Sequence, residues 1–237
     1  MPSLSICIPV KNRSRVEVDG HVLSLLPNCI RALASIYRLG DDWQIVVADW
    51  SSDDLPLSGW IDNMADPIPV KMVTMPEPFC CGRGLNKAAE LADAPNLLFL
   101  ATDMVMDRPT MDAGMRHLAV GEAYVPLPML AMDPEHKTLA FGELAVGTTF
   151  ITKALFEKAG PFPEFHSHGL CDTVWTARAD AEKIPIRVEA SPGLLHQWHP
   201  YDADWMNRYY DNWQKDNDEK LAAWKAGKFK GSDRWPM

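Results

Sequence analysis

Polar side chains that could bind a ligand follow three apolar stretches of this chain, each at the point where the stretch ends. Residues 97–103 (LLFLATD) form an apolar run that ends in a single carboxylate, Asp103. Residues 4–10 (LSICIPV) lead into Lys-Asn-Arg, and residues 44–48 (QIVVA) lead into the Asp and Ser residues of 49–54. Short apolar runs of this kind are typical of buried parallel strands, which carry ligand-binding groups at their C-terminal ends. We therefore expect one ligand crevice, with Asp103 as a candidate site residue.

The segments between these strands predict the helices that connect them. Apolar residues recur with helical spacing over 25–39, just before Gly40, and residues 84–92 form a second helix after a loop at 82–84. Residues 67–74 are a shorter strand candidate. The order strand, helix, strand, strand, helix, strand predicts an α/β fold with a mainly parallel central sheet flanked by helices.

The second half of the chain is less regular. Its expected helices span residues 110–119, 153–159 and 172–183, and its expected extended segments span 124–132, 143–151 and 186–189. From residue 201 to 237 the chain is charged, aromatic and helical in pattern. Tryptophans in this tail could stack on sugars, but we favour packing anchors that hold a helical extension against a first domain of residues 1–200.

Composition restricts the class of protein. The 237 residues suffice for a large core, and no apolar run approaches the roughly 20 residues that cross a bilayer. No secretory signal pattern precedes the first strand, and five cysteines without a Cys-x-x-Cys pair indicate reduced thiols, so we expect a cytoplasmic protein without a transmembrane segment. A net charge of -9 disfavours a nucleic-acid partner without excluding it, and is compatible with a site for a divalent cation.

Six segments follow one another along the chain: SICIPVKNR at 5–13, IVVADWSSDD at 45–54, GRGLNKAAELA at 82–92, LLFLATDM at 97–104, GPFPEFHSHGLCDTVWTAR at 160–178 and LHQWHP at 195–200. In this order they resemble the nucleotide-sugar-dependent glycosyltransferases of the GT-A fold, specifically family-2-like enzymes and chondroitin-polymerase-type domains. The resemblance implies a metal-dependent enzyme that moves a sugar from a nucleoside-diphosphate sugar, with uridine preferred, to a hydroxyl of a glycan or another acceptor.

The resemblance also implies where the sugar donor binds. It assigns the nucleoside to the ends of the first two strands, where Asp49 would accept a base N–H, and the diphosphate to Arg83 and the start of the following helix. Asp49 could instead cap its own turn, and Arg13 and Arg83 could be surface charges. The implied residues are Pro9, Val10, Asn12, Arg13, Asp49, Ser51, Arg83, Asn86 and Thr102.

A site for Mn²⁺ or Mg²⁺ is implied by the same resemblance. Asp103 lies at the family's Asp-x-Asp motif, although Ala101 replaces the first Asp. His196 matches the histidine that completes the metal shell, and His199 is its near alternative. Because side chains three residues apart on a strand point to opposite faces, we expect only one of the two rings to reach the metal. Without a metal, Asp103 could cap the next segment, and the histidines could be ordinary hydrogen-bonded residues.

Asp172 matches the Asp of the family's Glu-Asp pair. In inverting members this carboxylate is the general base that deprotonates the acceptor hydroxyl. Cys171 replaces the Glu of the pair, which affects the inference about the acceptor more than the inference about the base. Asp172 could alternatively be an acidic residue favoured by the dipole at a helix N-terminus. The flanking His166, His168 and Gly169 could form an acceptor loop.

Two other functions are compatible with these residues. Ala101 and Cys171 stand where carboxylates are expected, which would suit an inactive relative that only binds a nucleotide sugar. A nucleotidyltransferase shares the alternating architecture and the use of metal. It would normally have a glycine-rich loop with a basic residue after its first strand, and residues 11–14 (KNRS) do not supply one. An enzyme, unlike a binding protein, would lose product formation in Asp172→Asn while still binding the sugar donor.

Overall fold

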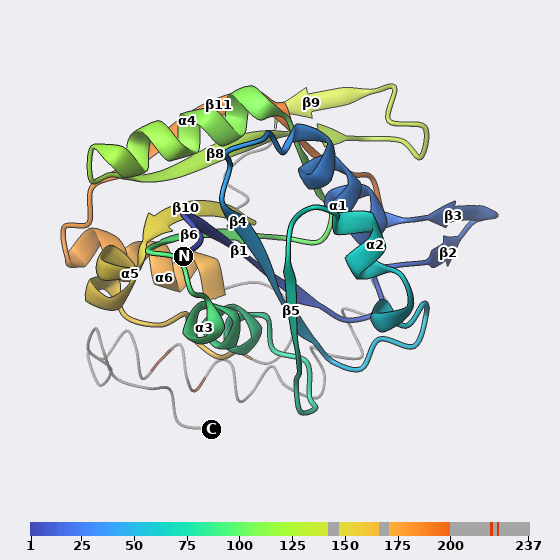
Figure 1. Ribbon diagram of the computed structural model, residues 1–237, viewed down its shortest axis with the longest axis horizontal. Coiled ribbons are helices and arrows are strands. Elements are labelled where there is room, and N and C mark those ends of the chain that lie inside the picture. The colour runs from blue at the N-terminus through green and yellow to red at the C-terminus, as the bar shows by residue number, and fades with distance from the viewer. Residues whose placement is uncertain (142–146, 166–170, 200–218, 220–221, 223–237) are drawn as a thin grey trace.

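A curled nine-stranded sheet lies at the centre of the structure, and helices cover both of its faces (Figure 1). The computed structural model describes residues 1–141, 147–165, 171–199, 219 and 222. Half of the sheet is parallel, in the order β5-β4-β1-β6. Its strands are β1 (Leu4–Val10), β4 (Trp43–Asp49), β5 (Val70–Thr74) and β6 (Asn96–Leu100).

The other half of the sheet is mixed. Strand β10 is antiparallel to β6 and to β8, β11 is parallel to β8, and β7 and β9 pair antiparallel with β11 and β8. These strands are β7 (Met104–Met106), β8 (Ala123–Ala131), β9 (Leu139–Phe141), β10 (Thr148–Thr152) and β11 (Ile186–His196). A separate hairpin joins β2 (Val16–Val18) to β3 (His21–Leu23). The expected α/β fold is confirmed. Its parallel half contains β1 and β4, whose C-terminal ends carry the predicted polar residues.

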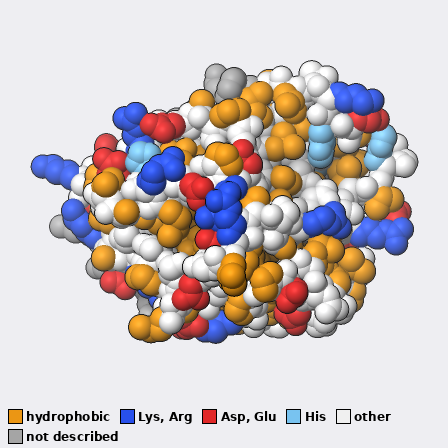
Figure 2. Space-filling model, turned by 45° about the horizontal axis from the view of Figure 1, so that its top comes forward, with side chains coloured by type: hydrophobic (Ala, Val, Ile, Leu, Met, Phe, Trp, Pro, Cys, Tyr) orange, Lys and Arg blue, Asp and Glu red, His pale blue; other side chains and the backbone are white. Residues whose placement is uncertain are grey.

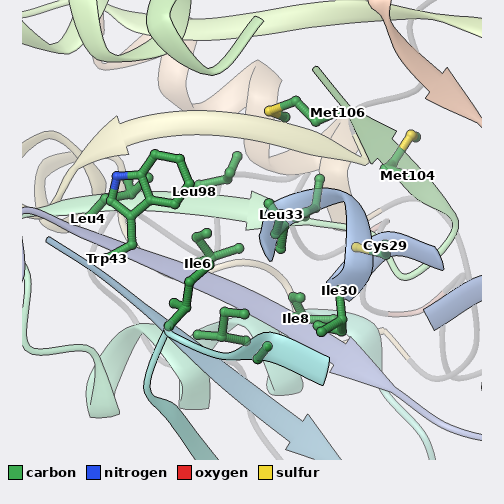
Figure 3. Close-up of a cluster of buried hydrophobic side chains, with 14 of the residues drawn as sticks. Leu4, Ile6, Ile8, Cys29, Ile30, Leu33, Trp43, Leu98, Met104 and Met106 are labelled. Atoms are coloured by element: carbon green, nitrogen blue, oxygen red, sulfur yellow. The ribbon is translucent and has the colours of Figure 1, made fainter. Parts of the chain in front are cut away.

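Alternate side chains of the parallel strands enter two different cores, which explains why these strands are apolar without interruption. Ile6 and Ile8 face a core shared with α1 (Leu25–Ile36), α2 (Ile61–Ala65) and α4 (Arg108–Ala119). Figure 3 shows part of this core, where Ile30 of α1 lies beside Ile8. Cys7, between the two isoleucines, faces the opposite core with α3 (Cys81–Leu91), α5 (Lys153–Ala159) and α6 (Cys171–Ala181).

Two expected element boundaries are wrong for identifiable reasons. The loop expected at residues 82–84 is the first turn of α3, because these glycines allow close packing within a helix and do not form a turn. Strand β11 continues well beyond the expected residues 186–189. It passes Pro192 through a shift in register between Ala190 and Leu195, since proline cannot donate a ladder hydrogen bond.

Other expectations fall partly outside the described residues. The strand expected from residue 143 is described only as β10, because residues 142–146 are not described. Of the predicted extension at 201–237, only residues 219 and 222 are described, both as helix, so the predicted division at residue 200 stays a prediction. Within the described ranges no helix is long and apolar enough to cross a membrane.

Candidate active site

One carboxylate and two imidazoles meet where β6 and β11 end. Asp103 lies between β6 and β7, His196 is the last residue of β11, and His199 follows three residues later. The Nε2 atoms of His196 and His199 lie 3.7 Å and 3.2 Å from Asp103 Oδ2. One ligand atom from each of the three residues lies within 4.8 Å of the others, as a shared metal ion requires.

Both histidines reach Asp103, so the expectation that their rings point to opposite faces is wrong. The alternation of side chains applies only while the strand continues, and β11 ends at His196. After that point the chain turns, and the two rings lie with their centroids 5.2 Å apart. The side chains of Asp103, His196 and His199 are only 15%, 26% and 14% exposed.

The surroundings of this cluster favour an ionised Asp103 carboxylate and a neutral His196 imidazole, which are the forms that bind a metal. Burial opposes ionisation of Asp103, but the neighbouring His199, His196 and Arg13 together hold its pKa below the ordinary value. Burial lowers the pKa of His196, with His199 and Arg13 acting in the same direction and Asp103 opposing them. Arg13, predicted from the end of β1, is therefore electrostatically part of this cluster.

The three residues fit a divalent cation by the chemistry of their donor atoms. Imidazole nitrogens and carboxylate oxygens are both ligands that divalent metal ions accept in proteins. Asp103 Oδ1 is buried and accepts no hydrogen bond from the described residues, so a ligand could use it. The alternative role of Asp103 as a cap is not observed for α4, because Asp107 caps that helix, accepting a 2.9 Å hydrogen bond from Thr110 N.

The ends of β1 and β4 are tied together by their own side chains. The Asn12 amide donates to Asp53 Oδ1 at 2.8 Å and accepts from Asp53 N at 3.0 Å, while Asn12 N donates to Ser52 Oγ at 2.9 Å. Asp54 Oδ2 accepts hydrogen bonds from the backbone N–H groups of Ser14 and Arg15, both at 2.7 Å. Ser52 and Asp54 were visible in the run of Ser and Asp at 51–54, but sequence reasoning singled out only Ser51.

Asp49 uses one oxygen of its carboxylate to hold its own turn. Its Oδ1 accepts hydrogen bonds from Ser52 N at 3.0 Å and Ser52 Oγ at 2.7 Å, which is the turn-capping role weighed from the sequence. None of the described residues donates a hydrogen bond to its Oδ2. Ser51 is exposed and has a left-handed φ of 50°.

The remaining predicted residues at the strand ends are more enclosed. Val10 is 1% exposed and packs in the core, so only its backbone could face a ligand, and its carbonyl already accepts from Trp50 N at 3.1 Å. Thr102 is also buried, next to Asp103 in the chain. Pro9 lies against α3, because a Cβ added to Gly84 would come 2.9 Å from the Pro9 Cβ.

Arg83 and Asn86 of α3 contact the segment 162–164, which follows α5. Arg83 Nε lies 3.1 Å from Glu164 Oε2, and both side chains are less than one-fifth exposed. The Asn86 amide donates to the Phe162 carbonyl at 2.9 Å and accepts from Phe162 N at 2.8 Å. These contacts hold residues 162–164, which lead toward α6.

Asp172 lies in the first turn of α6. Its neighbour Cys171 is 5% exposed and shares a thiol hydrogen bond with Cys81, which together with burial raises the pKa of Cys171 well above the ordinary value. Cys171 therefore supplies a neutral thiol where the resembling family has a carboxylate. Trp175 Nε1 further fixes the helix by donating to the Gly160 carbonyl at 3.0 Å. The predicted acceptor-loop residues 166, 168 and 169 lie outside the described residues.

Comparison with known proteins gives matches among solved structures only. No family model matches the chain, and no curated protein sequence matches it. The structure of TarS 1–349 from S. aureus in complex with UDP-GlcNAc matches with a TM-score of 0.65 and 15% identity, over 85% of this chain and 60% of that one. The mannosyltransferase PcManGT from Pyrobaculum calidifontis, in complex with GDP-Man and Mn²⁺, matches with a TM-score of 0.66 and 14% identity.

The second match covers 93% of this chain and 64% of the mannosyltransferase. This chain therefore spans less than two thirds of the length of either protein. At such low identity the likeness is one of fold, and it extends over most of the sheet and helices described above. Together with the element order and the sheet topology, it shows that this chain has the GT-A glycosyltransferase fold.

Proposed function

We propose that this chain is a metal-dependent glycosyltransferase that moves a sugar from a nucleoside-diphosphate sugar, with UDP as the preferred nucleotide, to an acceptor hydroxyl. The cluster of Asp103, His196 and His199 carries the proposal, because two imidazoles and a buried oxygen to which no described residue donates lie together at the C-terminal ends of strands. Ligands bind at this edge in open α/β sheets. Two solved structures of the same fold contain nucleotide sugars, and one of them contains Mn²⁺.

The sugar donor would lie between the ends of β1 and β4 and the metal cluster. Asp49 Oδ2 would accept an N–H of the base, while Asp49 Oδ1 keeps the turn in place. Arg13 would lie near the diphosphate, since its charge already acts on Asp103 and His196. Mn²⁺ or Mg²⁺ bound to the three ligands would offset the negative charge of the leaving diphosphate.

In the proposed reaction, the Asp172 carboxylate takes the proton of the acceptor hydroxyl. The hydroxyl oxygen forms a bond to the anomeric carbon, and the bond from that carbon to the diphosphate oxygen breaks, with the electron pair leaving on the diphosphate. Attack from the opposite face inverts the configuration. Asp172 sits on a helix whose N-terminal end is fixed through Cys171 and Trp175, which would keep the base in one position.

The proposed acceptor is a glycan or another non-nucleic-acid hydroxyl. The chain has a net charge of -9. Figure 2 shows acidic and basic side chains intermixed on one face, without a basic surface gathered there. A phosphate backbone is bound by clustered Lys and Arg, so neither observation favours a nucleic-acid acceptor.

Thermal unfolding with nucleotide sugars tests the sugar-donor site. UDP, UDP-GlcNAc and GDP-Man would each be added with and without Mn²⁺, because a ligand that binds only the folded protein raises the midpoint. We expect a Mn²⁺-dependent rise with one nucleotide, lost in Asp103→Ala and retained in the control Asp62→Ala, an exposed residue of α2. No rise with any nucleotide, or a rise that survives Asp103→Ala, would contradict the proposed site.

Product formation separates an enzyme from an inactive nucleotide-sugar-binding relative. With the sugar donor found above, release of the nucleoside diphosphate and transfer to an acceptor panel would be followed by mass spectrometry. We expect Asp172→Asn to retain the thermal response and lose transfer, while Asp180→Asn, an exposed residue of the same helix, keeps both. Binding without turnover in the unaltered chain would favour the inactive relative.

A further inference from the structure

A buried glutamine lies between the two histidines of the metal cluster. Gln197 is 1% exposed, and an amide is costly to bury unless its polar atoms are hydrogen-bonded. Its backbone N–H donates to the carbonyl oxygen of Asp103 at 2.8 Å. Gln197, which directly follows His196, is therefore hydrogen-bonded to the backbone of Asp103, the third metal-ligand candidate.

The Gln197 side chain extends away from the cluster to the first turn of α1. Its Nε2 donates to the Leu25 carbonyl oxygen at 3.0 Å, and its Oε1 accepts from Asn28 Nδ2 at 2.7 Å. Both ends of the amide thus have partners on one helix. These two bonds join segments that lie about 170 residues apart in the sequence.

The chemistry of the end groups fixes the direction of this series of hydrogen bonds. The Leu25 carbonyl can only accept, so the NH₂ group of Gln197 must face it. At the other end, Arg31 Nη1 donates to Asn28 Oδ1 at 3.1 Å, and a guanidinium can only donate. Neither amide can be reversed without placing two donors or two acceptors against each other.

The first turn of α1 also holds the segment after β1. Leu26 N donates to the Arg13 carbonyl at 2.9 Å. The ends of β1, β6 and β11 are therefore connected to one helical turn, through Arg13, the Asp103–Gln197 backbone bond and the Gln197 amide. In Figure 3, Cys29, Ile30 and Leu33 of this helix lie in the buried core, and the first turn is itself buried at Leu25 and Leu26, so packing holds the turn in place.

We propose that Gln197, oriented by Asn28, is the positioning residue that holds His196 and His199 against Asp103 in the arrangement that binds a divalent cation. The inference rests on the metal site of the proposed function. Residues that orient metal ligands typically change metal affinity about 10-fold to 100-fold when they are replaced. We expect an effect of that size here, because the two bonds of Gln197 fix the backbone between both imidazoles.

Calorimetric titration of the full chain with MnCl₂, without nucleotide, tests this role. We expect Gln197→Ala and Asn28→Ala to bind Mn²⁺ about 10-fold or more weakly than the unaltered chain. Gln197→Glu should be as weak as the alanine variant, since a carboxylate oxygen would then face the Leu25 carbonyl. Arg31→Ala should bind like the unaltered chain, because Arg31 is exposed and the Leu25 carbonyl still orients the series.

A matched control uses the same substitution at another buried glutamine. Gln44 is 5% exposed and its amide lies 2.7 Å from Ser5 Oγ, near the start of β4 and so at the strand end opposite the cluster. Gln44→Ala should lower the unfolding midpoint of the metal-free protein and leave Mn²⁺ affinity unchanged. A merely structural role for Gln197 would give the same result as this control.

The possible failures are distinguishable. Should Gln197→Ala and Asn28→Ala bind Mn²⁺ like the unaltered chain, the positioning role is overturned and the metal site stands. Should Gln197→Ala not fold, Asn28→Ala decides alone, because Asn28 is only half-buried. If the unaltered chain binds no Mn²⁺, or Asp103→Ala binds it equally well, the metal site of the proposed function fails and this inference fails with it.

Discussion

Replacing Asn86 distinguishes a residue that holds the fold from one that binds the sugar donor. In Asn86→Ala three hydrogen bonds are lost, two with the backbone of Phe162 and a longer one of 3.3 Å to Glu164. Each bond contributes about 1 kcal/mol net, and the Phe162 groups would be left unpaired at a residue that is only 2% exposed. We therefore expect a loss of about 2–4 kcal/mol in the free energy of unfolding.

For a chain of this size, such a loss lowers the thermal midpoint by about 5–15 °C. Scanning calorimetry without ligand would measure it, with Asn63→Ala, an exposed residue of α2, as the control that should stay within about 0.5 kcal/mol of the unaltered chain. We further expect a nucleotide that binds the unaltered chain to raise the midpoint of Asn86→Ala by a similar amount. An unchanged midpoint together with loss of the nucleotide response would refute this reasoning and place Asn86 at the diphosphate.

Three further predictions follow from packing and ionisation. Gly84→Ala should destabilise the fold by about 1–3 kcal/mol in a urea titration, since the new Cβ would lie 2.6 Å from the Trp50 ring, and a wild-type midpoint would contradict this packing. Because burial lowers the pKa of His196 and keeps its imidazole neutral to below the ordinary histidine value of 6.5, protonation of His196 should weaken Mn²⁺ binding, measured by calorimetry, only at a pH below 6.5; a loss of affinity that begins above 6.5 would contradict this sign. Burial raises the pKa of Cys7 and of Cys80 to about 12, so mass spectrometry should find neither alkylated by iodoacetamide at about pH 8 until urea is added, and rapid labelling of the native protein would refute it.

The parallel half of the sheet could be predicted because a strand that is buried on both faces is apolar at successive positions of the sequence. Residues 97–100 are apolar at every position since alternate side chains enter different cores. Short elements such as the β2–β3 hairpin and β7 were not predicted, because three residues are too few to show a period. The start of α3 was missed because Gly82 and Gly84 are needed for close approach, Gly82 to the Pro163 carbonyl and Gly84 to Trp50, and glycine alone cannot distinguish this use from a turn.

The cluster of Asp103, His196 and His199 was partly predictable for a related reason. Asp103 was marked by its place after an apolar strand, whereas the convergence of both histidines depends on where β11 ends, and no local signal fixes that residue. Gln197 carried no signal beyond its place between two histidines. Its role depends on Leu25 and Asn28, which lie far away in the sequence and could be connected to it only through the structure.

The predicted site residues differ in whether their polar side-chain atoms already form hydrogen bonds within the fold. Both ends of the Asn12 amide are used by Asp53, and both ends of the Asn86 amide by Phe162, so these side chains shape the loops around the site. Asp103 Oδ1 is different, because it is buried and no described residue donates to it. Leaving such an acceptor unsatisfied costs about 1–3 kcal/mol, more for a charged group, unless a ligand supplies the missing partner. Within the described residues, the fold thus uses the amides of Asn12 and Asn86 for its own hydrogen bonds and leaves Asp103 Oδ1 for the proposed cation.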